Sequence, residues 1–218
     1  MAFSLNPAVQ PEALPDDGST DLPKDLKLKH TWNFWEQLNQ GAQGKSGYAE
    51  STRKFGTCST VEEFWSMFSD VPQPSQLFEN RMARVTPDGA AALDGVMLFK
   101  DGVRPEWEDP ANAVGGHFQV QLLPSLGGAT IDELWNNIVM GCIGNTLDLK
   151  GLLTGVRLVD KLGSRTANIR LEVWFRCPVG DPDVLELRQM VKDCMHTRLD
   201  GTLTKAKTPA LEVKSHVT

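Results

Sequence analysis

The sequence lacks any long hydrophobic run. None of its segments approaches the roughly 18 consecutive apolar residues that a membrane-spanning helix requires. The first 25 residues also lack the basic start and the following apolar stretch of a secretory signal peptide. We therefore expect a cytoplasmic protein, and a nuclear location is also compatible with the sequence.

Patterned spacing of cysteine and histidine is missing too. The four cysteines lie far apart without a C-x-x-C pair, and the four histidines show no ligand spacing. A structural metal site or a disulfide framework needs closer and more regular spacing. We expect reduced, mostly buried thiols, and neither a metal nor a cofactor.

Motifs of catalysis are absent as well. The chain has no G-x-S-x-G, no H-E-x-x-H and no glycine-rich dinucleotide-binding turn. Residues 39–46 end like a phosphate-binding loop, but Asn39 replaces its first glycine, and no strand and helix are predicted to flank it. We expect a protein that binds and does not catalyse.

An excess of positive charge is the last missing feature. The net charge of −6 argues against a protein that holds nucleic acid mainly by neutralising many phosphates, although a small basic patch facing one end of an RNA fits. The chain has six tryptophans and a single tyrosine. Several of these tryptophans stand in polar, charged segments, where packing in a core explains them poorly.

The sequence predicts one domain preceded by a tail. Residues 1–25 are rich in Pro, Asp and Ser and predict a flexible tail, and residues 26–218 predict a single domain. Three polar caps, each with an acid close behind, predict helix starts. These caps are Thr60-Val-Glu-Glu63, Thr130-Ile-Asp-Glu133 and Asp181-Pro182-Asp183, and Gly201 is expected to end the third helix.

Short alternating or apolar runs predict strands at 96–99, 117–122, 155–159 and 168–175. The last run alternates well, since its apolar side chains fall on one face and its polar ones, with Trp174, on the other. Residues 78–95 carry turn formers and predict a long mobile loop. This order of elements predicts an α+β fold with helices on one face of an antiparallel sheet.

The strongest local signal is Phe99-Lys-Asp-Gly-Val-Arg-Pro-Glu-Trp-Glu-Asp109. Trp107 follows a proline and stands between two acids in a segment too polar for a core strand. It is either a tryptophan packed over a loop or an exposed stacking platform. A platform beside a carboxylate suits guanine, because the ring stacks and the carboxylate accepts two hydrogen bonds from the base edge.

Several blocks of the sequence resemble the translation initiation factor 4E family, in that family's order. They are Trp32-Asn-Phe-Trp35, Thr60-Val-Glu-Glu-Phe-Trp65, the segment 99–109, Gly115-Gly116, Leu134-Trp135 with Cys142-Ile-Gly144, and Val173-Trp174. The resemblance covers roughly residues 29–200. It implies a curved antiparallel sheet with three helices packed on its convex face.

The resemblance also implies a binding site for the 7-methylguanosine cap of mRNA on the concave face. Tyr48 and Trp107 would sandwich the base, Glu108 would bind its edge, and Trp174 would contact the N7-methyl group. Tyr48 is a departure, since family members usually carry tryptophan there.

Cations for the cap triphosphate follow from the same resemblance. Arg170 and Lys161 take the family's basic positions, and Arg165 in the turn between them is a further candidate. His117 replaces a third basic residue, which predicts a weaker or pH-dependent phosphate contact.

The helical face is implied to bind a scaffold protein of the 4G type or a 4E-binding protein. The residues assigned to this surface are His30, Val61, Trp65, Asn136, Asn137 and Met140. Asn136-Asn137 stand where the family usually has Leu-Glu, so a charge partner for a scaffold arginine is lost.

The expected function is therefore recruitment of capped mRNA for translation initiation. One alternative is a cap-binding repressor without productive scaffold contact. A cap-metabolising pyrophosphatase would need an acidic metal cluster, which the sequence does not indicate. A carrier of hydrophobic ligands would need an apolar concave face, which Arg170, Glu172 and Arg176 contradict.

Overall fold

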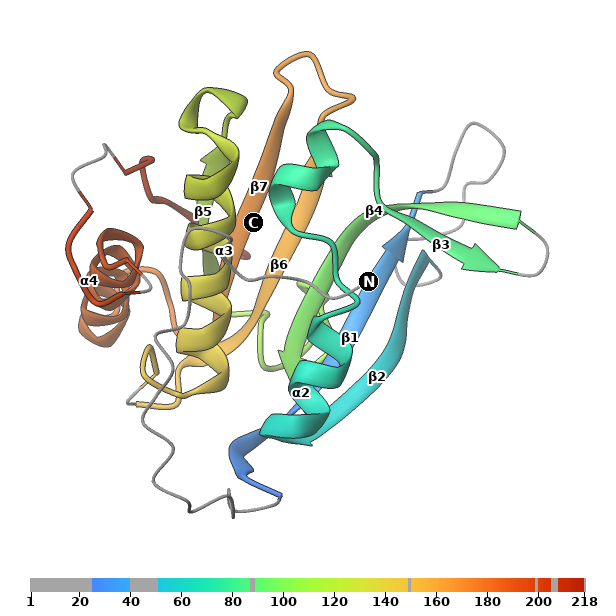
Figure 1. Cartoon of the computed structure of the whole chain (residues 1–218). Helices are drawn as coiled ribbons and strands as arrows, with labels where there is room; N and C mark the ends of the chain where they lie inside the picture. The colour runs from blue at the N-terminus through green and yellow to red at the C-terminus, as the bar shows by residue number, and fades with distance from the viewer. Residues whose placement is uncertain are drawn as a thin grey trace, which may run out of the picture.

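One antiparallel sheet frames the protein, as the computed structural model shows (Figure 1). The structure describes residues 25–39, 51–86, 89–148, 150–198, 200–204 and 208–217. Seven of the eight described strands follow the order β2-β1-β4-β6-β7-β5-β8, and the eighth, β3, pairs with β4 alone. The strands are β1 (Lys27–Leu38), β2 (Thr52–Thr60), β3 (Ala83–Thr86), β4 (Gly89–Lys100), β5 (Gly116–Leu122), β6 (Leu153–Lys161), β7 (Asn168–Phe175) and β8 (Glu212–Ser215).

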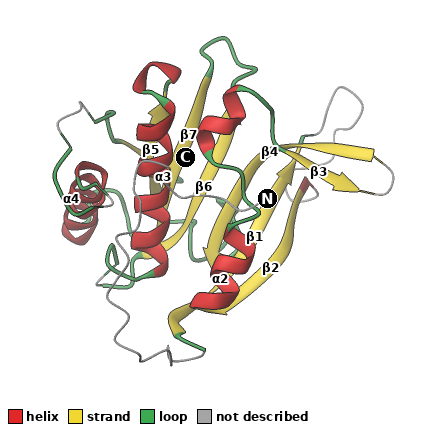
Figure 2. Cartoon of the chain, viewed as in Figure 1, coloured by secondary structure: helices red, strands yellow, loops and turns green. Residues whose placement is uncertain are grey.

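Helices α2 (Val61–Phe68) and α3 (Gly128–Ile143) lie on one face of this sheet, and α4 (Pro182–His196) packs beside α3 (Figure 2). Two short 3-10 helices are also present: η1 (Pro74–Phe78) lies between α2 and β3, and η2 (Pro124–Leu126) lies between β5 and α3. The predicted α+β fold, an antiparallel sheet backed by three helices, is confirmed. No helix in the described part of the chain is long and apolar enough to cross a membrane.

The central strands of the sheet are buried on both faces. The predicted apolar side of β7, which includes Leu171 and Phe175, is fully buried against the helices in the main core. On the opposite face a smaller cluster contains Met97, Phe99, Val103 and Trp174, with Trp35 packed against it. This second cluster lies where a loop covers the helix-free face, and it supports the candidate site.

Two of the three predicted helix starts are confirmed. Thr60 closes a capping box, since its hydroxyl accepts from the Glu63 N–H at 3.1 Å and the Glu63 carboxylate accepts from the Thr60 N–H at 3.2 Å. Asp181 caps α4 by accepting from the Asp183 N–H at 2.8 Å.

The predicted start of the second helix at Thr130 is wrong. The helix begins at Gly128, and Asp132 instead accepts hydrogen bonds from the N–H and hydroxyl of Ser75 at 2.8 and 2.6 Å. The predicted stop at Gly201 is also wrong, because α4 ends at His196. A cap-like pattern thus need not mark the first turn of a helix.

The predicted loop at 78–95 is wrong as well. Strands β3 and β4 form a hairpin with Ala83 opposite Ala92 and Thr86 opposite Gly89. The hairpin extends past the ends of the neighbouring strands, since β4 pairs with β3 before it pairs with β1 (Figure 1). Two turn formers of this segment, Asp94 and Gly95, lie within β4, and the alanines at 90–92 give no alternating signal. The predicted tail lies outside the described residues except for Asp25.

Replacing Thr60 by alanine should lower the free energy of unfolding by about 1 kcal/mol, because the cap of α2 is lost. Ser66→Ala, at an exposed position inside the same helix, is the matched control. It should change stability by less than about 0.5 kcal/mol, since alanine favours helix. Urea denaturation measures both, and equal losses would contradict the capping role.

Candidate functional site

The loop from Asp101 to Gly115, between β4 and β5, carries Trp107 and Glu108. Its turns are held by side chains of the loop. Asp109 accepts from the backbone N–H of Arg104 at 2.9 Å and of Ala111 at 2.8 Å. The Asn112 amide donates to the carbonyls of Arg104 and Glu106, both at 2.9 Å. These bonds fix the backbone on either side of Trp107.

The acids of this loop have different surroundings. Glu106 forms an ion pair with Arg104 at 2.8 Å, and Asp109 holds the backbone. Glu108 is exposed beside Trp107. Glu108 is therefore the most exposed acid of this group, and its contact with a base edge stays a prediction.

Trp107 is 49% exposed, although one face of its indole is covered. That face stacks on His216, with ring centroids 5.6 Å apart and planes inclined by 16°. A half-exposed indole on a fixed backing can stack a second flat group on its open side. Tyr48, the predicted second ring of the sandwich, lies outside the described residues.

Trp174 lies deeper in the same cluster. Its indole N–H donates to the Glu172 carboxylate at 2.9 Å, and its ring packs edge-on against Phe99. His216 lies 4.5 Å from its ring centroid, and His117 stacks on it at 5.6 Å. Trp174 is only 1% exposed. Its contact with an N7-methyl group stays a prediction that would require part of this ring to be uncovered.

His117 and His216 form a hydrogen-bonded pair behind Trp107. His216 Nδ1 lies 2.9 Å from the carbonyl oxygen of Asn112, which can only accept, so the neutral ring carries its proton there. His216 Nε2 then accepts from His117 Nδ1 at 3.0 Å. Burial lowers the pKa of His117 to about 4, although the Glu172 carboxylate opposes this, and burial also lowers the pKa of His216.

His117 is therefore neutral near pH 7 and only 5% exposed. Its role as a phosphate contact stays a prediction, and this burial argues against it. The resemblance gave no role to His216, because nothing near it in the sequence marks a site.

A buried carboxylate organises the cations of this face. Glu172 is 1% exposed and pairs with Arg170 at 2.7 Å and with Arg157 at 3.5 Å. Burial would raise the pKa of Glu172, but the two guanidiniums outweigh it and hold that pKa below its usual range. Arg157 also donates to the Gln37 side chain at 2.5 Å. The sequence prediction included Arg170 but missed Arg157.

The strand register places two predicted phosphate ligands on one face. Lys161 pairs with Asn168 across β6 and β7, and residues 168, 170, 172 and 174 alternate to the same side. Lys161 thus shares the face of Arg170 and Trp174. Lys161 and Arg165 are exposed at the β6–β7 turn, while Arg170 is half-buried against Glu172.

The helix-bearing face carries the predicted partner surface. Trp65 is 37% exposed on α2, and Val61, Met140 and His30 are half-buried. The remaining two residues are engaged within the fold. Asn136 is buried and donates to Gln73 at 3.0 Å, and Asn137 donates to the carbonyl of Thr197 at 2.5 Å.

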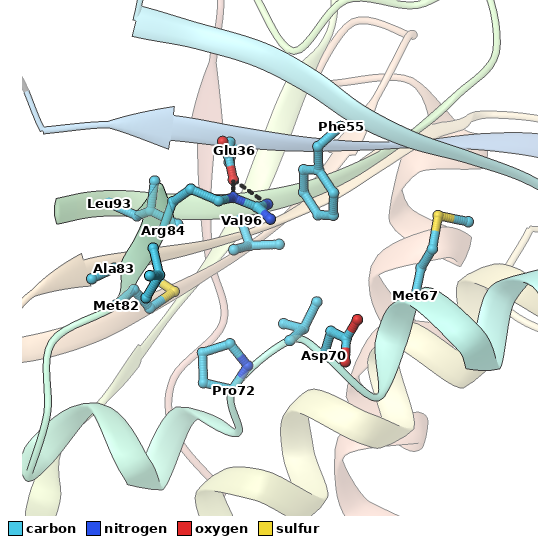
Figure 3. A pocket seen from close by; sticks show the side chains of 12 residues that line it. Glu36, Phe55, Met67, Asp70, Pro72, Met82, Ala83, Arg84, Leu93 and Val96 are labelled. Atoms are coloured by element: carbon cyan, nitrogen blue, oxygen red, sulfur yellow. Dashed lines mark hydrogen bonds and ion pairs between the residues drawn. The ribbon is translucent and has the colours of Figure 1, made fainter. Parts of the chain in front are cut away.

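A hollow of about 730 Å³ lies beside α2, between this helix and the β3–β4 hairpin (Figure 3). Its apolar wall includes Phe55, Met67, Val71, Pro72, Met82, Leu93 and Val96. Glu36 lies at its base, fully buried, and pairs with Arg53 and with Arg84, whose Nε is 2.9 Å from the carboxylate. The Arg84 guanidinium also covers Phe55 at 4.8 Å. The sequence reasoning did not find this hollow, because no motif marks it.

Within the described residues, no cluster of three or more His, Cys, Asp or Glu could hold a metal ion.

Acid should destabilise the fold through the histidine pair. In the unfolded chain His117 takes up a proton near its ordinary pKa of 6.5. In the folded protein its pKa is about 4, so it stays neutral until the pH falls to that value. The free energy of unfolding should thus fall by roughly 2–3 kcal/mol between these pH values. His117→Phe should flatten this part of the curve in urea denaturation at each pH. An unchanged slope in the variant would assign the acid effect to other groups.

Comparisons with solved structures match this fold. Caenorhabditis elegans eIF4E-3, in a complex with the 4E-binding protein Mextli and a cap analog, has a TM-score of 0.65 at 22% identity, covering 88% of this chain and 93% of that one. Ascaris suum eIF4E-3 in complex with m2,2,7G cap has a TM-score of 0.64 at 19% identity, covering 87% and 98%. At these identities the likeness shows the fold alone.

Sequence comparison adds the family. The family described as eukaryotic initiation factor 4E matches residues 27–208. The Zea mays translation initiation factor isoform 4E-2 is 34% identical over 164 residues, which cover 72% of this chain and 68% of that protein. Initiation factor 4E of Saccharomyces cerevisiae is 31% identical over 196 residues, covering 87% and 79%. The chain therefore belongs to the eukaryotic initiation factor 4E family, as its motifs predicted.

Proposed function

We propose that this protein binds the 7-methylguanosine cap of mRNA with Trp107 as the stacking platform and Glu108 as the ligand of the base edge. The observation that carries the proposal is the half-exposed Trp107 indole, backed by His216 and flanked by an exposed carboxylate. Tyr48 would supply the second ring. Two structures of the same fold, both of eIF4E-3, contain a cap or cap analog, which agrees with a cap as the ligand.

The chemistry of the cap explains why two rings and one carboxylate suffice. Methylation at N7 gives the guanine a positive charge, so stacking of about 1–3 kcal/mol gains cation–π attraction of roughly 0.5–2 kcal/mol. Glu108 would accept from N1 and the exocyclic amine of the base, and charge-assisted bonds of this kind are strong. Plain guanine lacks the positive charge and should bind more weakly.

The triphosphate would meet the cations on the same face. Lys161 and Arg165 are exposed at the β6–β7 turn, and Arg170 lies on the adjoining strand. Because Glu172 already neutralises part of Arg170, the two exposed cations should carry more of the phosphate attraction. This patch is small enough to agree with the net charge of −6.

The helical face would bind a scaffold of the 4G type or a 4E-binding protein. Trp65 offers the exposed aromatic anchor that such interfaces favour. The hollow beside α2 could extend this surface, since Met67 of the same helix lines it. Recruitment of capped mRNA to a scaffold would place the protein in translation initiation, and we propose a cytoplasmic site of action.

Cap binding can be tested by tryptophan-fluorescence titration with 7-methyl-GTP and with GTP. Trp107→Ala should weaken binding of the methylated ligand at least tenfold, because stacking and cation–π attraction are lost. Unaltered affinity in this variant would remove the basis of the proposed site.

Exchange of single acids tests the base-edge contact. Glu108→Gln should weaken binding of 7-methyl-GTP by roughly ten- to a hundredfold, since hydrogen bonds to a charged group are worth about 1.5–3 kcal/mol. Glu106→Gln in the same loop is the matched control and should have little effect, because this carboxylate pairs with Arg104. If Glu106→Gln lost more affinity than Glu108→Gln, the proposed assignment of the base edge to Glu108 would be wrong.

Partner binding is tested by Trp65→Ala. We expect a loss of about thirtyfold or more in affinity for a 4E-binding protein, as for other buried interface tryptophans, with cap affinity unchanged. Leu185→Ala, 59% exposed on α4, is the control. Pull-down with a full-length scaffold separates the alternatives, because a repressor would bind the cap but fail to retain the scaffold.

A further inference from the structure

The carboxyl-terminal strand reaches the candidate cap site. Strand β8 pairs with β5, with Ser215 opposite Gly116 and Lys214 opposite His117. Immediately after it, the N–H of His216 donates to the carbonyl of Gly115 at 3.0 Å. His216 is only 7% exposed, whereas its neighbour Val217 is 61% exposed. The chain thus inserts one ring behind the loop that carries Trp107.

Both nitrogens of this ring are engaged, which fixes its orientation. Nδ1 faces the carbonyl of Asn112 at 2.9 Å, and Nε2 faces His117 Nδ1 at 3.0 Å. Asn112 in turn donates to two carbonyls of the Trp107 loop, those of Arg104 and Glu106. The imidazole plane is therefore set relative to the backbone on both sides of Trp107.

The back of the ring is also closed. His216 lies against Trp174, whose centroid is 4.5 Å away and whose indole is anchored on Glu172. His117 fills the adjoining space, stacked on Trp174. The ring of His216 therefore has a fixed support behind it and the Trp107 indole in front, inclined by only 16°.

An exposed tryptophan without such a backing would sample several rotamers, and a ligand would have to order it. Immobilising one side chain on binding costs affinity by roughly two- to tenfold. A flat ring behind the indole removes most of this cost, because the free protein already holds the platform in place.

We propose that His216 is a positioning residue for cap binding, whose imidazole holds the Trp107 indole in its stacking orientation before the ligand arrives. This inference rests on the proposed function, since it deepens the role of the same site. It makes the residue that follows β8 part of the binding site, although neither this residue nor β8 is assigned to touch the base.

The test compares His216→Ala with His216→Phe, because phenylalanine keeps a flat ring without the two hydrogen bonds. We expect His216→Ala to weaken 7-methyl-GTP binding by roughly three- to tenfold and His216→Phe to stay within about threefold of the parent. Affinity for a 4E-binding protein should be unchanged in both, which a general loss of folding would not allow. Val217→Ala is the control and should bind like the parent.

A second measurement needs no ligand. The indole N–H signal of Trp107 in a ¹⁵N-resolved NMR spectrum, assigned by its absence in Trp107→Phe, should shift or broaden in His216→Ala and stay sharp in Val217→Ala. Parent-like affinity together with an unchanged Trp107 signal in His216→Ala would overturn the positioning role. If even the parent fails to bind 7-methyl-GTP, the proposed function fails, and the NMR comparison still decides whether His216 holds Trp107.

Discussion

The concave face depends on one buried charge, the carboxylate of Glu172. A carboxylate that is 1% exposed would be costly without partners, and here two guanidiniums and an indole N–H supply them. Its bond to Trp174 orients that ring, the ring supports the two histidines, and His216 supports Trp107. The platform at the surface is thus connected to the sheet by a continuous series of packed rings.

The same sheet separates the two proposed binding surfaces by alternation along its strands. On β4, Val96 lines the hollow beside α2, while its neighbour Met97 belongs to the cluster under Trp174. On β1, Trp35 packs against that cluster and Glu36 lies at the base of the hollow. Neighbouring residues of one strand therefore shape the proposed cap face and the proposed partner face, which explains how a small domain can present both.

The structure was predictable from the sequence where interactions between nearby residues alone determine it. The capping box at Thr60 and the alternation of β7 were read correctly, because each involves residues within a few positions of one another. Strands β1 and β2 were not predicted, since burial on both faces removes a clean alternating pattern from β1. The start of α3 was misplaced because the helix begins at Gly128 after Gly127, an N-cap that forms no side-chain hydrogen bond, so no polar cap marks it in the sequence.

The candidate site was also predictable only in part. Trp107 and Glu108 stood out because a tryptophan among acids and turn residues fits a core poorly. His216 could not be found, since its contact with His117 spans 99 residues and depends on the register of β8 against β5. The position of His216 directly after β8 also has a practical consequence. A deletion or insertion within β8 would shift its register against β5 and displace the ring behind Trp107. This strand should therefore be left intact when the protein is engineered for assays of RNA capture.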